Sequence, residues 1–214
     1  MRVWVKRVLA PLMYRRPIPE LPPERLYLYL DALWRTRDLP GAVVEVGCFQ
    51  CGTAAWAARM LRAMHARREY VCIDTFGGFV GDQFDEDVRA GTAESHRSGF
   101  SANSRDFVQS LLERWDVPEI MLIQGDIVSL PASALPDQVA VALVDVDLEV
   151  PTYAALEKIY PRLADGGVMF VDDCVEEPSN TFRGARIGYQ RFVADHHLPE
   201  EYRFGMGAIQ NRNC

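Results

Sequence analysis

The chain has 214 residues, a length that suits one domain with a well-filled core or a domain with short additions. Its formal net charge of −7 argues against a nucleic-acid-binding protein, because a phosphate partner requires a basic face. No apolar run approaches the ~18–20 residues of a membrane span. The cysteines are odd in number and several fall in or beside expected core strands, which is typical of a reduced, cytoplasmic protein.

Residues 1–40 are expected to form an N-terminal arm and helix. The arm, Met1–Arg16, is basic and partly apolar, so one interpretation is an interfacial anchor at anionic lipid. The favoured alternative is a segment that packs on its own domain or on a partner subunit, because the arm is short and Pro11 interrupts it. That alternative leaves a homodimer open. After the proline-rich connector Pro17–Pro23, an apolar stripe predicts a helix over Glu24–Asp38.

A strand, a glycine-containing loop, a helix and a second strand come next, in the pattern of a nucleotide-binding βαβ unit. The strands are expected over Gly41–Gly47 and Glu69–Asp74, and the helix over Ala54–Arg67 with Thr53 as its N-cap. Asp74 lies about 22 residues beyond the last loop glycine, close to the spacing of an acid that binds a ribose. Because GxGxxG is missing, the looser loop of an S-adenosylmethionine enzyme fits better than a NAD site.

The same loop contains Cys48-x-x-Cys51, which resembles a redox pair or half of a zinc site. The sequence has no second CxxC or CxxH motif to complete a zinc site. The favoured interpretation is that both cysteines simply occupy the cofactor loop.

Residues 75–104 show no clear periodicity and combine glycines with phenylalanines, which is typical of a lid over a site. Ser104 is expected to cap a helix over Arg105–Trp115, and a third strand is expected over Glu119–Gln124. Asp126 follows that strand. It either accepts a hydrogen bond from an adenine amine or caps the next turn, and the sequence favours neither.

Two apolar stretches, Val141–Asp147 and Gly166–Asp173, each end in a pair of acids and have the pattern of buried parallel strands. Residues 152–163 between them have helical spacing, so the strands are expected to be neighbours with their acidic ends together. Strand side chains alternate, so Asp145 and Asp147 are expected to point the same way.

With Asp172 and Asp173 at the neighbouring strand end, four carboxylates are expected to meet at the ligand-binding edge of the sheet. Their repulsion raises their pKa values, and a hard divalent cation such as Mg²⁺ or Ca²⁺ relieves it. This metal site is favoured over the alternative in which each acid caps a following helix or loop.

Near the C-terminus, a helix is expected over Arg183–His196, and Tyr202–Gln210 is expected to contain the last strands. His196 and His197 are interpreted as solvent-facing residues at a helix end. The predicted fold class is α/β: a doubly wound, mostly parallel Rossmann-like sheet with helices on both faces and an antiparallel last strand. Residues 41–214 are expected to form this domain, with the lid over about 75–104.

Several motifs between residues 41 and 195 occur together: Glu45-Val-Gly-x-x-x-x-Gly-Thr53, Asp74-Thr-Phe-x-Gly-Phe79, Asp145-x-Asp-Leu148, Thr152-x-x-Ala-Leu156, Tyr160-Pro161 and Gly166-Gly-x-x-x-x-Asp-Asp173. Together they resemble the macrocin O-methyltransferase family. The resemblance implies a class I enzyme dependent on S-adenosylmethionine and Mg²⁺. Such an enzyme transfers a methyl group to a hydroxyl of a sugar or a glycosylated small molecule, and a methylmannoside or other oligosaccharide is one acceptor left open.

The resemblance also implies a role for each matching residue. Asp147 would be the general base. The metal ligands would be Asp145, Asp172 and Asp173. The cofactor contacts, from the methionine end through the ribose to the adenine, would be Glu45, Gly47, Thr53, Asp74, Ser104 and Asp126.

Two departures from the family pattern bear on the substrate and on the cofactor loop. Glu149-Val150 stands where the family usually has an aromatic residue, and Cys51 stands where it tends to have a second glycine. Three alternative functions stay open: an O-methyltransferase of a catechol-like acceptor, a nucleotide-dependent oxidoreductase and a non-catalytic cofactor-binding subunit. The missing GxGxxG disfavours the oxidoreductase, and the full set of acids argues against a non-catalytic subunit.

Overall fold

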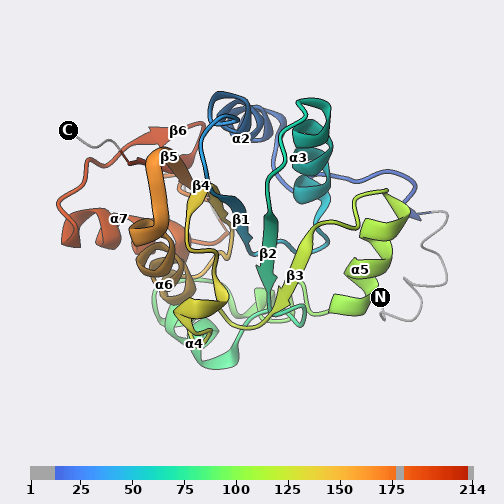
Figure 1. Ribbon diagram of the computed structural model, residues 1–214. Helices are drawn as coiled ribbons and strands as arrows, with labels where there is room; N and C mark the ends of the chain where they lie inside the picture. Colours follow the sequence, from blue (N-terminus) through green and yellow to red (C-terminus); the bar gives the residue numbers. More distant parts are fainter. Residues whose placement is uncertain (1–12, 177–180, 212–214) are drawn as a thin grey trace.

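A seven-stranded sheet in the order β3-β2-β1-β4-β5-β7-β6 forms the centre of the computed structural model, which describes residues 13–176 and 181–211 (Figure 1). The strands are β1 (Ala42–Val46), β2 (Tyr70–Asp74), β3 (Met121–Gln124), β4 (Val139–Val144), β5 (Leu163–Val171), β6 (Tyr202–Arg203) and β7 (Met206–Gln210). The α-helices are α2 (Pro23–Arg35), α3 (Gly52–Ala63), α4 (Gly81–Arg89), α5 (Arg105–Arg114), α6 (Glu149–Ile159) and α7 (Gly184–Asp195). Short 3₁₀ turns are η1 (Glu94–His96), η2 (Ala132–Ala134) and η3 (Tyr160–Arg162).

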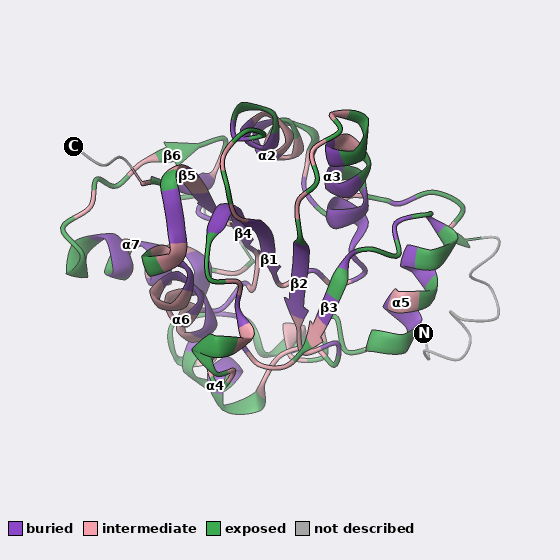
Figure 2. Cartoon of the chain, in the orientation of Figure 1, coloured by how far each residue is buried: buried purple, intermediate pink, exposed green. Residues whose placement is uncertain are grey.

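The sheet is parallel from β3 to β5, and β7 runs antiparallel to β5. Successive strand residues face opposite layers, as Val43 packs with α2, α3 and α5 while Val44 packs with α6 and α7. The central strands β1 and β4 are buried along their whole length, which Figure 2 shows as purple arrows beneath helices with exposed outer faces. The predicted doubly wound α/β fold with an antiparallel last strand is confirmed.

The strand order reverses between β1 and β4, which creates a crevice at the carboxyl edge of the sheet. In Figure 1, α4 lies beyond the edge toward which β2 and β3 point. Ligands of open α/β sheets bind at such a reversal point, so the loops after β1, β2, β4 and β5 are positioned to form a site.

The expected N-cap at Thr53 is wrong, because α3 begins at Gly52, two residues before the expected start, and its N-cap is Cys51 in a left-handed conformation. The Thr53 hydroxyl instead accepts a hydrogen bond from the backbone N–H of Glu20 at 3.1 Å, which ties the N-terminal segment to the start of α3. The expected cap at Ser104 is confirmed, since its hydroxyl accepts from the backbone N–H of Phe107 at 3.3 Å.

Residues 75–104 show no clear periodicity in the sequence, yet they contain α4 and η1. The buried face of α4 consists of Gln83, Phe84 and Asp87, so only one apolar residue marks it and no apolar period is visible in the sequence. Asp87 accepts a hydrogen bond from the backbone N–H of Glu149 at 2.9 Å, and it thereby caps α6 from the neighbouring helix.

Residues 13–22, which comprise the last four residues of the expected arm and most of the proline-rich connector, pack on their own domain. The indole N–H of Trp115 donates to the carbonyl of Tyr14 at 3.0 Å, and that of Trp56 donates to the carbonyl of Pro17 at 3.1 Å. Residues 1–12 of the arm lie outside the described residues. Every helix in the described part of the chain falls short of the length and apolar character needed to cross a membrane.

Candidate functional site

A cavity of about 480 Å³ lies at the carboxyl edge of the sheet, within the size range of small-molecule sites. Its walls come from the segment before α2, from the loops after β1 to β5 and from the region around α4. Among the predicted site residues, those that line it are Gly47, Asp74, Asp126, Asp145, Asp147, Asp172 and Asp173.

Three carboxylates form a cluster on one side of this cavity. Asp145, Asp172 and Asp173 each place an oxygen within 4.8 Å of the others. They converge because Val144 of β4 is paired in register with Val171 of β5, so the residues that follow both strands begin at the same level. Burial first, and then the neighbouring carboxylates, raise the pKa of Asp145 well above its usual range. Oxygen donors gathered in this way fit a hard divalent cation.

Asp147 lies beside this cluster, but the strand alternation that was expected to place it there is wrong. The strand β4 ends at Val144, and Asp147 has a left-handed backbone with φ of 65°. Its backbone carbonyl accepts from the N–H of Ala185 at 2.9 Å, which fixes the turn. Burial, the charge of Asp173 and a hydrogen bond to Asp173 raise the pKa of Asp147 well above its usual range.

The residue that sequence reasoning missed in this cluster is Arg25, in the first turns of α2. Its Nη1 donates to Oδ1 of Asp172 at 2.7 Å and to Oδ1 of Asp173 at 2.9 Å, and its Nε donates to the carbonyl of Phe204 at 3.1 Å. Burial and Asp173 raise the pKa of Asp172 to about 6, and Arg25 opposes this rise. No motif connects residue 25 with residues 172 and 173, so the sequence carried no signal for the contact.

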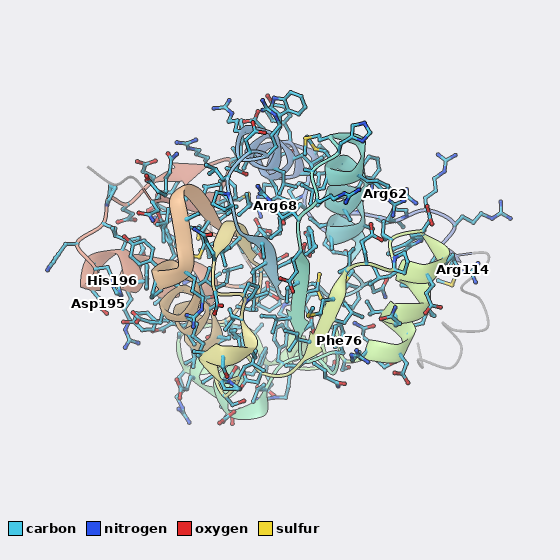
Figure 3. The ribbon with its side chains drawn as sticks, in the orientation of Figure 1. Arg62, Arg68, Phe76, Arg114, Asp195 and His196 are labelled. Atoms are coloured by element: carbon cyan, nitrogen blue, oxygen red, sulfur yellow. The ribbon has the colours of Figure 1, made fainter. Side chains whose placement is uncertain are left out.

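Asp74 forms the opposite side of the cavity at the end of β2. Its Oδ2 accepts from the backbone N–H of Phe49 at 2.8 Å, and its Oδ1 accepts from that of Phe76 at 2.6 Å. Phe76, which Figure 3 labels, lies just past the end of β2. These contacts orient the carboxylate. Burial raises the pKa of Asp74, and the backbone N–H donors work against this rise.

Gly47 and Asp126 are also part of the wall. A Cβ at Gly47 would lie 1.9 Å from the backbone oxygen of Asp145, so a side chain there would force the ends of β1 and β4 apart. Asp126 accepts from the backbone N–H of Val128 at 3.0 Å and from the amide of Gln83 at 2.9 Å. It therefore caps the turn after β3, one of its two expected roles, while it also lines the cavity.

The other predicted cofactor contacts do not line the cavity, and their assignment to the cofactor stays a prediction. The carboxylate of Glu45 is buried behind the wall and accepts from the hydroxyl of Tyr70 at 2.6 Å, which in turn lies 2.9 Å from that of Tyr29. Burial raises the pKa of Glu45 well above its usual range. The hydroxyls of Thr53 and Ser104 hold the N-terminal segment and the start of α5, respectively.

Aromatic side chains form an apolar part of the cavity wall. The ring centroid of Phe79 lies 5.6 Å from those of both Phe100 and Phe182, and all three residues line the cavity. The glycine- and phenylalanine-rich stretch after Asp74 indicated Phe79 and Phe100 in the sequence. No sequence pattern indicated Phe182. His196 lies at the end of α7, away from the cavity, where its Nε2 lies 2.6 Å from Glu157 (Figure 3).

Comparison with known proteins identifies relatives of this chain. Two curated relatives, both from Streptomyces, match part of the chain. The demethyldecarbamoylnovobiocin O-methyltransferase of Streptomyces niveus is 29% identical over 142 residues, or 64% of this chain and 53% of that protein. The 8-demethyl-8-(2,3-dimethoxy-alpha-L-rhamnosyl)-tetracenomycin-C 4'-O-methyltransferase of Streptomyces olivaceus is 30% identical over 141 residues, or 63% and 53%. The chain thus spans about half the length of these relatives.

The solved structure of the O-methyltransferase NovP superposes with a TM-score of 0.74 at 22% identity, covering 89% of this chain and 79% of that one. At this identity the likeness shows the fold. The profile of the macrocin-O-methyltransferase (TylF) family matches residues 30–203, a range that contains β1 to β5 and all four clustered aspartates. The chain therefore belongs to the macrocin-O-methyltransferase family.

Proposed function

We propose that this protein is a Mg²⁺-dependent O-methyltransferase that transfers a methyl group from S-adenosylmethionine to a hydroxyl of a sugar or a glycosylated small molecule. One observation carries the proposal. A single cavity joins an oriented acid at the end of β2, suited to a ribose, with a carboxylate cluster at the ends of β4 and β5. Family membership and the two curated relatives support the same reaction, since both relatives are named as O-methyltransferases and the name of one includes a rhamnosyl group.

The cofactor half of the proposal rests on Gly47, Asp74 and Asp126. Backbone N–H groups of Phe49 and Phe76 hold the two oxygens of Asp74, so the carboxylate is oriented at the end of β2, where a ribose hydroxyl would bind. Gly47 lines the cavity, and its lack of a side chain lets the backbone after β1 lie against that of Asp145 after β4. Asp126 lies at the end of β3, farther along the edge, as an adenine contact would require.

The metal half rests on Asp145, Asp172 and Asp173, whose all-carboxylate donor set suits Mg²⁺. When bound, a divalent cation supplies positive charge that lowers the free energy of deprotonating a nearby hydroxyl. Arg25 contacts two of the three carboxylates and supplies one compensating charge from the protein itself. Together they reduce the repulsion within the cluster.

Asp147 is proposed as the general base. Methyl transfer forms a C–O bond, breaks a C–S bond and releases the hydroxyl proton, which a nearby group must accept. Burial and the adjacent Asp173 raise the pKa of Asp147, and this makes it a stronger base than an exposed aspartate. The aromatic wall of Phe79, Phe100 and Phe182 in the same cavity offers an apolar surface to the ring of a glycoside.

Glu149 and Val150, where the chain departs from the family pattern, do not line the cavity, whereas their neighbours Leu148 and Pro151 do. The acceptor and the methylated hydroxyl stay open. A homodimer and a cytoplasmic location remain predictions.

The test is a screen of labelled S-adenosylmethionine against sugars, glycosides and catechols, with and without a chelator. We expect transfer to a sugar or glycoside that the chelator abolishes and Mg²⁺ restores. Asp147→Asn should lower kcat by about 10²–10⁴-fold. Transfer that continues in the chelator would remove the metal from the proposal, and transfer only to catechols would replace the acceptor class.

A further inference from the structure

Three cysteines gather directly behind the wall of the cavity. The sulfur atoms of Cys48, Cys51 and Cys72 all lie within 4.8 Å of one another. The residues are 1%, 0% and 0% exposed, and all three are free thiols. Sequence reasoning found no partner for Cys48-x-x-Cys51, because the third thiol comes from the middle of β2 and belongs to no motif.

The fold holds the three thiols in place. Cys72 is paired in register with Glu45 across β1 and β2, so its position is set by the sheet. The backbone N–H of Cys51 donates to the carbonyl of Cys48 at 2.6 Å, which closes the loop into a tight turn. Cys51 has φ of 59°, a conformation that glycine adopts more easily, and it still places a thiol in the cluster.

The surroundings favour a thiolate at this point. Cys51 directly precedes α3, and the positive end of a helix dipole stabilises negative charge. Ordinary apolar packing requires none of these features.

The spacing also suits a metal. With a metal–sulfur bond of about 2.3 Å, three sulfurs in a triangle around the ion lie about 4.0 Å apart. The thiols reach that spacing with small side-chain movements. Among the described residues no fourth cysteine, histidine or acid lies within 4.8 Å of all three thiols, although Asp74 hydrogen-bonds to Cys48 alone. A structural zinc site takes four ligands, whereas three sulfurs suit a soft ion that prefers thiolates.

We propose that Cys48, Cys51 and Cys72 form a binding site for a soft thiophilic cation of the Cu(I) class. Each copper–thiolate bond that forms releases one thiol proton to solvent, and no electron is transferred. Gly47 and Phe49 on either side of Cys48 line the cavity, so the ion reaches the thiols by a local opening of this loop. The proposal does not rest on the proposed methyl transfer, but the thiol cluster adjoins the proposed cofactor site, because the Cys48 thiol hydrogen-bonds to Asp74.

The test is a competition between the full chain and the chromophoric chelator bicinchoninate for Cu(I) without oxygen. We expect the wild type to take one equivalent, with X-ray absorption reporting sulfur neighbours alone. Cys51→Gly is the variant of choice, because glycine suits the left-handed backbone and the fold should be retained. Cys174→Ala is the matched control, since Cys174 is another buried free cysteine and lies outside the cluster.

Cys51→Gly and Cys72→Ala should weaken Cu(I) binding by about 100-fold or more, while Cys174→Ala should bind as the wild type does. Three outcomes would overturn the proposal. The wild type takes no copper from the chelator, or the cluster variants bind as tightly as the wild type, or Zn(II) binds the folded chain more tightly than Cu(I).

Discussion

Arg25 holds two acids of the carboxylate cluster, and replacing it tests how that cluster is stabilised. The guanidinium reaches Asp172 at 2.7 Å and Asp173 at 2.9 Å, and the three side chains are 12%, 8% and 29% exposed. Arg25→Gln keeps a similar length and removes the charge. Asp172 and Asp173 then remain close together without this counter-charge from the protein.

Removing one partner of a fully buried ion pair costs about 3–5 kcal/mol. Because Asp173 keeps some contact with solvent, we discount this and expect a loss of about 2–3 kcal/mol in the free energy of unfolding. For a chain of this size that corresponds to a melting temperature lower by about 5–10 °C. Mg²⁺ should stabilise the variant, because any ligand that binds the folded state alone raises stability.

The assay is urea unfolding with and without Mg²⁺, and Arg62→Gln is the matched control. Arg62 on α3 also bonds two acids, Asp116 and Glu119, but at the surface, where its side chain is 48% exposed (Figure 3). We expect little change in the control because exposed ion pairs contribute little. Equal stability of the Arg25 and Arg62 variants would refute the reasoning from burial.

Three further predictions concern other parts of the site. Asp74→Asn should weaken S-adenosylmethionine binding by about 1.5–3 kcal/mol in calorimetry, the size of a charge-assisted hydrogen bond, and unchanged affinity would remove Asp74 from the cofactor site. Asp87→Ala should lower the free energy of unfolding by about 0.5–2 kcal/mol through loss of the α6 cap, and Asp85→Ala, on the exposed side of α4, serves as the control. Residues 77–103 should exchange amide hydrogens more slowly once cofactor and acceptor are bound, and equal exchange in the two states would count against a lid.

The sheet and the position of its acids were predictable because both follow from local pattern. Apolar runs such as 141–144 and 168–171 mark buried strands, and acids directly after parallel neighbours must share one edge. The helix α4 was not predictable in this way, since polar Gln83 and Asp87 occupy its buried face. These polar residues make tertiary contacts, so the buried face of the helix lacks the apolar period from which a helix is predicted.

The contacts that complete the site join residues far apart in the chain. Arg25 and Asp172 are separated by 147 positions, and Cys72 joins Cys48 and Cys51 only through the pairing of β1 with β2. Thr53 shows the converse case. It fits the sequence pattern of a helix cap, yet the N-terminal segment takes its hydroxyl. Whether a side chain caps a helix depends on which other groups compete for its hydrogen bonds, and these competing groups cannot be read from the sequence.

The most direct test of the carboxylate cluster is to measure Mn²⁺ binding by electron paramagnetic resonance, which counts the free ion, with Mn²⁺ standing in for Mg²⁺. The wild type, Asp145→Asn and Asp147→Asn would be titrated side by side. We predict one bound ion in the wild type, binding weaker by about 100-fold or more in Asp145→Asn, and binding close to wild type in Asp147→Asn. Equal loss in both variants would contradict the separation of metal ligand from base, and no binding by the wild type would contradict the metal site itself.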